Sequence, residues 1–249
     1  LESGIIHHHM LRMCQATRFI HHMRGLPNEY TAGIAREIDD LLWDAYKKYN
    51  LKDWDVPADP TLTQIEMEQD ARTQFFTSVA GGGLGIAPNS AITHAAFYSG
   101  VAISLRMAAH IGARYPDLDE AIHSPQFQNS PFMKAFGNSR AFLLACPAGV
   151  TPEEGVQLRL AEAAAAAAAK AQGQKPETPA TMLVIPGFAE LYRHVGDGNG
   201  TRLEIIPDQK RLTTLARTHD TDLYKTTNTS QLTQARMAAL TPTTVRVTA

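Results

Sequence analysis

RTQFFTSVAGGGLGIAP, residues Arg72–Pro88, joins a polar stretch to a long apolar one through four glycines within Gly81–Gly85. Pro88 and Asn89 then supply residue types that typically begin a helix. The sequence that follows is nearly apolar on all sides, which predicts a buried central helix over about residues 90–114. We therefore expect a mainly α fold, an irregular helical domain around this central helix with a helical C-terminal extension.

The composition is that of a globular chain. Hydrophobic residues make up 44% of its 249 positions, which is enough for a buried core. Its 23 basic and 25 acidic side chains give a formal charge of −2, so any contact with nucleic acid must come from a local basic face. The two cysteines, Cys14 and Cys146, are too few for a disulfide framework and indicate an intracellular protein, nuclear or cytoplasmic.

The sequence predicts neither a signal peptide nor a membrane span. The first ten residues, LESGIIHHHM, lack the basic start and apolar run of a secretory signal. The most lipid-like segment, Ala91–Leu105, is shorter than the roughly 20 apolar residues that a spanning helix needs. We expect no membrane partner, and we expect the reading frame to continue upstream of Leu1 because the chain begins within a predicted helix.

Helical spacing and helix-breaking residues predict the remaining elements. Six further helices are expected, over Ile5–Arg24, Thr31–Tyr49, Ser130–Leu144, Leu158–Ala171, Gln209–Tyr224 and Ser230–Leu240. The first two should pack antiparallel because their connection is short. Asn50–Gln74 is polar and carries two prolines, so we expect a loop with at most one helical turn, and Met182–Ile185 predicts a short strand or helix edge. In the second helix the predicted core face consists of Ile34, Ile38, Leu41, Leu42, Ala45 and Tyr49.

The glycine cluster has two interpretations. Glycines allow backbone N–H groups to approach a phosphate, and the next helix would offer its positive N-terminus. However, the cluster lacks the Gly-Lys-Ser/Thr of a Walker loop and the G-x-G-x-x-G of a dinucleotide loop. A structural turn is therefore favoured over a phosphate site.

No other residue set specifies a catalyst or a metal site. His7, His8, His9, His21 and His22 have no accompanying ligand motif, so a solvated or packing role is favoured. Asp39 and Asp40 form a pair like that of polymerases, but they fall inside a predicted helix, and that chemistry needs two carboxylates aimed at a cleft. Carboxylates in two other segments are interpreted as hydrated loop or turn residues: Glu66 and Asp70, and Asp117, Asp119 and Glu120. The cysteines have no base at a diagnostic spacing. We expect no catalytic residue, no metal ligand and no cofactor.

Three short motifs, taken in order, resemble a known family. MLRMCQATRFIHHMRGLPNEYTAGIAREIDDLLWDAY, then Gly82-Gly83-Leu84-Gly85-Ile86, then Ala95-Ala96-Phe97-Tyr98 are similar to the segment that follows the catalytic palm in reverse transcriptases of non-LTR retroelements. DQKRLTTLARTHDTDLYK and QARMAAL resemble a helical stretch further downstream. The likeness covers residues 1–145 and 205–249, and the alanine-rich middle is unmatched. The family has Leu-Pro and a basic residue before the glycines, where this chain has Phe75–Ala80.

The resemblance implies a fragment of an RNA-directed DNA polymerase without its active site. Its Mg²⁺ ligands and palm would lie upstream, and residues 1–147 would be a helical thumb-like domain, 148–180 an alanine-rich helix and linker, and 181–249 a small helical segment. Such a segment would hold the RNA/DNA template–primer independently of sequence, with Arg12, Arg18 and Arg24 as candidates. For each arginine the alternative is an ordinary solvated side chain.

Two other functions are compatible with the sequence. A helical structural or scaffold protein, nucleocapsid-like and without enzymatic activity, would also have a small-residue central helix and no catalytic motif. A small-molecule enzyme that uses the glycine loop would require a nucleotide that stabilises the fold.

Overall fold

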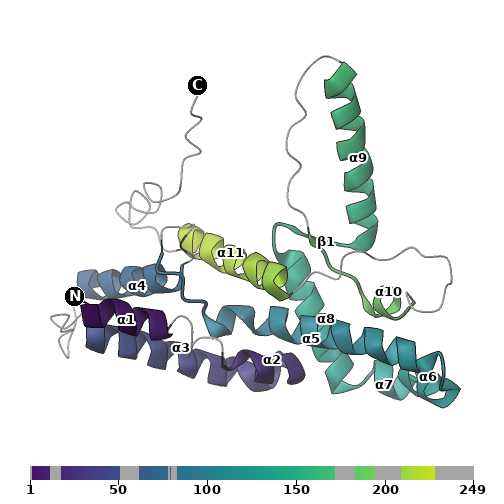
Figure 1. Ribbon diagram of the computed structural model, residues 1–249, viewed down its shortest axis with the longest axis horizontal. Helices are drawn as coiled ribbons and strands as arrows, with labels where there is room; N and C mark the ends of the chain where they lie inside the picture. The colour runs from purple at the N-terminus through teal and green to yellow at the C-terminus, as the bar shows by residue number, and fades with distance from the viewer. Residues whose placement is uncertain are drawn as a thin grey trace. The chain divides into compact units, whose positions relative to one another are not determined.

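The computed structural model describes residues 2–11, 18–50, 62–77, 79, 83–171, 183–193 and 209–227. Within these residues the chain forms eleven helices and two short strands, so the predicted mainly α class is confirmed (Figure 1). The chain divides into two compact units of non-contiguous segments. The first unit comprises Leu1–Met23, Glu29–Thr93 and Arg217–Ala249, and the second comprises Arg24–Asn28 and His94–Ala216. The expected three-part division along the sequence stays a prediction.

Three helices of the first unit pack around an aromatic cluster. They are α1 (Glu2–Met10), α3 (Asn28–Asn50) and α4 (Leu62–Phe76). Trp43 and Phe75 are nearly fully buried, and their rings lie 5.5 Å apart. His7 on α1 packs 4.3 Å from Tyr49 near the end of α3, whereas Leu11 joins the cluster near Leu42. The two helices therefore run antiparallel, as predicted.

The core face of α3 differs from the predicted one. Its buried residues are Thr31, Ala35, Asp39, Leu42 and Trp43. Of the residues predicted to be buried, Ile34, Leu41 and Tyr49 are 49%, 68% and 50% exposed. A different face of α3 is turned toward the core because Asp39 bonds the start of another helix and Trp43 enters the aromatic cluster. The spacing of apolar residues in the sequence does not predict these contacts.

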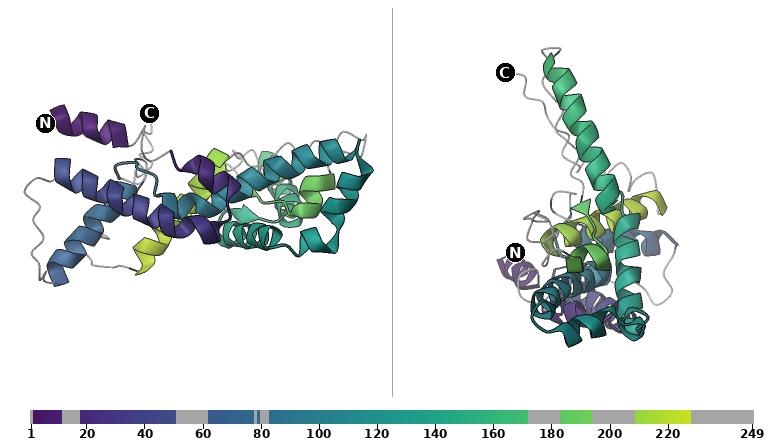
Figure 2. Two further views of the ribbon diagram at one scale, coloured as in Figure 1. Left: turned by 90° about the horizontal axis from the view of Figure 1, so that it is seen from below. Right: turned by 90° about the vertical axis from the view of Figure 1, so that its right-hand side faces the viewer.

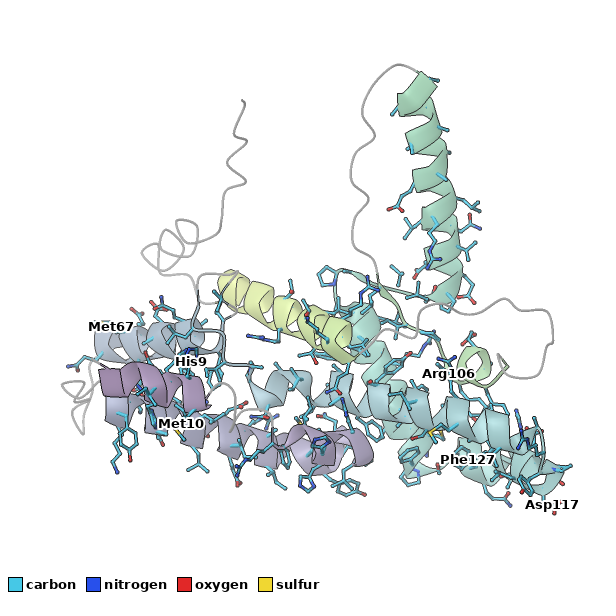
Figure 3. All side chains as sticks on the ribbon, in the orientation of Figure 1. His9, Met10, Met67, Arg106, Asp117 and Phe127 are labelled. Atoms are coloured by element: carbon cyan, nitrogen blue, oxygen red, sulfur yellow. The ribbon has the colours of Figure 1, made fainter. Side chains whose placement is uncertain are left out.

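Two predicted elements of the first unit are wrong. The single helix over Ile5–Arg24 is interrupted, because Arg18 and Phe19 form a turn before α2 (Ile20–Gly25). Met10, at the end of α1, is 55% exposed (Figure 3). The predicted loop over Asn50–Gln74 contains the 15-residue helix α4, whose Glu68 pairs with Lys47 and whose Phe75 is fully buried.

The second unit is built on α5 (Asn89–Gly112), which confirms the predicted central helix. The boundary between the units falls inside it, after Thr93. Ala95, Phe97, Tyr98 and Ala102 are all fully buried, in one core cluster with residues of α8 (Pro131–Ala145). Tyr98 stacks on Phe136 at 5.3 Å and donates a hydrogen bond to the carbonyl of Pro186. The small residues of α5 thus allow large aromatic side chains to pack against it.

Between α5 and α8 lie α6 (Pro116–His123) and α7 (Pro125–Gln128). The acidic residues expected in a turn, Asp117, Asp119 and Glu120, are part of α6, where Pro116 and two acids in the first turn favour a helix start. Asp117 is exposed, as Figure 3 shows, and Asp119 accepts a hydrogen bond from the hydroxyl of Tyr192.

The alanine-rich segment forms α9 (Pro152–Ala171), which begins with a capping box between Thr151 and Glu154. Its base is anchored by Gly155, which is buried against Val184, and most of its other described side chains are exposed. Figure 2 shows α9 extending away from α5 and α8. The helix predicted over Leu158–Ala171 is confirmed, and it begins earlier, at Pro152.

Two short strands and two helices complete the described residues, and the last of these helices belongs in part to each unit. Strand β1 (Gly149–Val150) pairs in parallel with β2 (Leu183–Val184), with Gly149 opposite Leu183. Of the two alternatives predicted for Met182–Ile185, a short strand or a helix edge, β2 is the strand. After α10 (Phe188–Arg193) comes α11 (Gln209–Thr227), close to the predicted bounds. The predicted helix over Ser230–Leu240 lies outside the described residues. None of the described helices has the length and apolar character needed to cross a bilayer.

Candidate functional site

The glycine junction connects α4 to α5, and its described residues are 77, 79 and 83–88. Gly85 has a positive φ of 82°, which strongly favours glycine. A Cβ on Gly83 would lie 2.3 Å from the carbonyl oxygen of Thr77 and 2.6 Å from that of Gln74, so only glycine fits there. Gly82 lies outside the described residues. Backbone geometry is therefore sufficient to explain two of the glycines in the motif.

The backbone N–H groups at the end of the junction are already hydrogen-bonded. Leu84 donates to the carbonyl of Gln74 at 2.9 Å, and Gly85 donates to that of Thr77 at 2.8 Å. These bonds satisfy carbonyls at the C-terminal end of α4, where intrahelical partners run out. Neither N–H group is available for a phosphate.

Arg217 fixes the two sides of the junction. Its guanidinium donates to the carbonyl of Phe76, at the end of α4, and to that of Ile86, each at 3.2 Å. One planar group thus bridges the backbone before and after the glycines. Arg217 lies on α11, 131 positions after Ile86 in the sequence.

A buried carboxylate occupies the N-terminus of α5. Asp39 is 2% exposed, and its Oδ1 accepts from the backbone N–H and side-chain amide of Asn89 at 2.7 and 3.0 Å. Its Oδ2 accepts from the backbone N–H and hydroxyl of Ser90 at 2.8 and 2.7 Å. Burial raises the pKa of Asp39 and outweighs these four hydrogen bonds, which lower it. Asp39 therefore caps α5 from a different helix.

This arrangement gives the junction a structural role. A phosphate site at the start of α5 would need free N–H groups and an unoccupied helix N-terminus. Here Leu84 and Gly85 bond to α4, and Asp39 takes the position an anion would occupy. The geometry therefore favours the turn over the phosphate loop.

The other carboxylates of this region pair with neighbouring side chains. Asp40, adjacent to Asp39, is exposed and forms an ion pair with Arg72 of α4. Glu68 accepts from Lys47 Nζ at 2.8 Å and from Trp43 Nε1 at 3.3 Å, and the hydrogen bond from Lys47 lowers the pKa of Glu68. Asp39 and Asp40 thus bond to different elements, unlike a pair that shares one metal ion.

The histidines and the described cysteine show packing interactions. His8 lies edge-on to Tyr46 at 6.2 Å, and His21 and His22 are exposed. Within the described ranges, no group of three His, Cys, Asp or Glu side chains could hold a metal ion. Burial raises the pKa of the Cys146 thiol to about 11, which makes it a poor nucleophile. Cys14 is outside the described residues.

Of the three candidate arginines, Arg24 has the most informative surroundings. It lies at the end of α2, is exposed, and donates from Nε to the side-chain carbonyl of Gln209, 185 positions away at the start of α11. Arg18 is exposed just before α2 and belongs to the first unit. Arg12 lies outside the described residues. Nothing in the local sequence indicates the contact between Arg24 and Gln209.

His94 forms a partly buried polar contact that the sequence did not indicate. Its Nε2 lies 3.1 Å from Asn28 Nδ2, its Nδ1 lies 3.1 Å from Ser139 Oγ, and its ring stacks on Phe142 at 4.5 Å. Ser139 is fully buried, so a substrate could not reach its hydroxyl. The arrangement links α5 to α8 and is not a nucleophile with its base.

Acidification is expected to destabilise the protein through His94. Burial lowers the pKa of His94, so the unfolded chain binds this proton more readily than the folded one. The stabilisation from the neutral ring is present above the ordinary pKa of 6.5 and is lost as the pH falls through the folded pKa. Urea unfolding at about pH 7.5 and about pH 5.5 should show a larger loss for the wild type than for His94→Gln. His21→Gln, at an exposed position, should keep the wild-type loss, and equal losses in wild type and His94→Gln would contradict the expectation.

Comparison with protein-family models, with curated proteins and with solved structures finds no match for this chain.

Proposed function

We propose that this chain is a non-catalytic, helical segment of a non-LTR retroelement reverse transcriptase, and that it holds the template–primer duplex independently of sequence. The observation that supports the proposal is the order of the motifs on the fold. Gly83-Leu84-Gly85-Ile86 forms the turn into α5, and the triplet Ala95-Ala96-Phe97 lies fully buried in that helix. The residues of the resemblance thus build one continuous feature.

The carboxylates support a non-catalytic role. Polymerase chemistry needs two carboxylates that converge on metal ions in a cleft. In this chain Asp39 is buried as a helix cap and Asp40 is paired with Arg72. The contribution of the chain to polymerisation would therefore be to bind and orient nucleic acid for a palm encoded upstream.

Duplex binding and primer extension test the proposal. The purified chain should bind a labelled RNA–DNA hybrid in fluorescence anisotropy, with similar affinity for unrelated sequences and a Kd that rises steeply between about 50 and about 200 mM salt. It should extend no primer with Mg²⁺ or Mn²⁺. Nucleotide incorporation by the purified chain would contradict the non-catalytic role, and the absence of salt-sensitive binding would contradict the nucleic-acid role. A Phe/Tyr-Ala-Asp-Asp motif encoded upstream of Leu1 would support the proposal. Its absence from that reading frame would contradict the proposed palm.

A helical scaffold protein is the second candidate, and a specific surface favours it. Ile103, Met107 and Ile111 recur every fourth residue on α5 and are 50%, 62% and 43% exposed. An apolar stripe of this kind is typical of helices that pack against another chain. Light scattering separates the two functions, because a discrete oligomer that binds no duplex would favour the scaffold.

A further inference from the structure

The C-terminal half of α5 carries an exposed apolar stripe, which consists of Ile103, Met107 and Ile111. These side chains are 50%, 62% and 43% exposed, and all three belong to the second unit. Because they recur every fourth residue, they lie along one side of the helix over a length of about 12 Å. Leu105 and Ala109, between them in the sequence, are buried in the core. The rotation of α5 is therefore fixed, and the α5 stripe cannot turn inward.

Two arginines accompany the α5 stripe. Arg106, labelled in Figure 3, precedes Met107 directly, and Arg114 follows Ile111 by three residues. Both side chains are exposed, and neither guanidinium has a hydrogen-bond or ion-pair partner among the residues that the structure describes. From position 89 to position 116 the sequence contains no Asp or Glu. This surface therefore combines large apolar side chains with positive charge that no described acid neutralises.

We infer that the α5 stripe and its two arginines bind an acidic amphipathic helix of a partner protein. Apolar residues three or four positions apart on the partner helix would cover the stripe, and Asp or Glu side chains at its borders would pair with the guanidinium groups. A phosphate backbone fits this surface less well, because it would neutralise the arginines and leave three large apolar side chains facing a strongly hydrated chain. The inference goes beyond the proposed function and does not depend on it.

The test selects helical peptides against the full chain. A phage-displayed library would fix leucine at the a and d positions of each heptad and randomise the positions beside them. Binders should be enriched in Asp and Glu over Lys and Arg at the randomised positions, because only acids complement the two arginines. A library that gives no binders, or binders with no excess of acids, would contradict the inference.

Substitution of the central residue of the α5 stripe locates the binding site of a selected peptide. Met107→Ser should weaken binding by about tenfold or more in fluorescence anisotropy, since a central apolar anchor usually contributes a large share of the binding energy. The matched control is Leu160→Ser, at an equally exposed position (62%) on α9 of the same unit, which should keep the wild-type Kd. Equal Kd values for wild type and Met107→Ser would show that the peptide binds elsewhere.

A charge exchange tests the role of the arginines independently of folding. Arg106→Glu with Arg114→Glu should weaken binding of the acidic peptide by about tenfold and should bind the same peptide with Lys in place of each acid. A misfolded variant would not gain this binding. Failure of the Lys peptide to bind the exchanged variant would contradict the pairing of the arginines with acids.

Two further measurements identify any other occupant of the α5 stripe. If light scattering shows an oligomer of the wild type that Met107→Ser abolishes, a second copy of the chain covers the stripe and the inference is wrong. If Met107→Ser instead loses binding of the RNA–DNA hybrid and keeps the peptide, the stripe contacts nucleic acid. Because the peptide selection contains no nucleic acid, the proposed function and this inference can each fail while the other stands.

Discussion

Replacing Gly100 with alanine is expected to destabilise the protein by about 2–3 kcal/mol, because the added methyl group would overlap a neighbouring backbone. The new Cβ would lie 2.3 Å from the carbonyl oxygen of Arg24, 3.0 Å from its carbonyl carbon and 3.2 Å from its Cα. A side chain could rotate away from such a contact, but here the end of α2 would have to move. Urea unfolding monitored by circular dichroism measures the effect.

The control is the same substitution in two open helical positions. Gly137 of α8 and Gly33 of α3 have no atom within 4 Å of a built Cβ. At such sites alanine is the better helix former, so Gly137→Ala and Gly33→Ala should stabilise the protein by about 0.5–1 kcal/mol each. The expected effects therefore differ in sign as well as size. Stabilisation by Gly100→Ala would show that α2 does not pack on α5 as described.

Elements with strong local signals could be predicted from the sequence. Central helix α5 has apolar residues on all sides, α8 begins with Ser130-Pro131, and α9 begins with a capping box. Each signal lies within a few residues of the element it defines. The existence and approximate bounds of these helices could therefore be predicted without knowledge of their tertiary partners.

Elements stabilised by distant partners could not be predicted in this way. The helix α4 was predicted as a loop because its ion pairs are made with α3, Glu68 with Lys47 and Arg72 with Asp40, and not within the segment itself. The burial of Asp39 could not be predicted because its bonding partners lie 50 residues further on. A buried polar residue is stabilised only by such partners, and a single sequence does not record them.

The same limit applies to the candidate site. The sequence favoured a turn over a phosphate site, since no phosphate motif is complete, and the geometry of Gly83 and Gly85 agrees with a turn. It gave no indication that Arg217 bridges Phe76 and Ile86, or that Arg24 meets Gln209. Both contacts join segments more than a hundred positions apart, so they depend on the whole fold and not on a local pattern.

Asp39→Ala is the second substitution with a large expected effect, a loss of about 3 kcal/mol in the free energy of unfolding. It would leave the donors of Asn89 and Ser90 without an acceptor at the start of α5, and Asn89 is fully buried. Asp40→Ala is the matched control, since the adjacent exposed carboxylate pairs with Arg72 on the surface and should contribute about 0.5 kcal/mol or less. Equal effects of the two substitutions would contradict the capping role of Asp39.

Asp39→Asn distinguishes a helix cap from an anion site. The amide keeps one acceptor and removes the cost of burying a charge, so we expect a smaller loss of about 1–2 kcal/mol. If the glycine junction were a phosphate site that Asp39 blocks, this neutral variant would bind inorganic phosphate, and its Tm would rise with phosphate concentration. We expect no such rise, because the N–H groups of Leu84 and Gly85 remain bonded to α4 whichever side chain stands at position 39. A phosphate-dependent Tm in Asp39→Asn would instead favour a small-molecule site at the glycines over the structural turn.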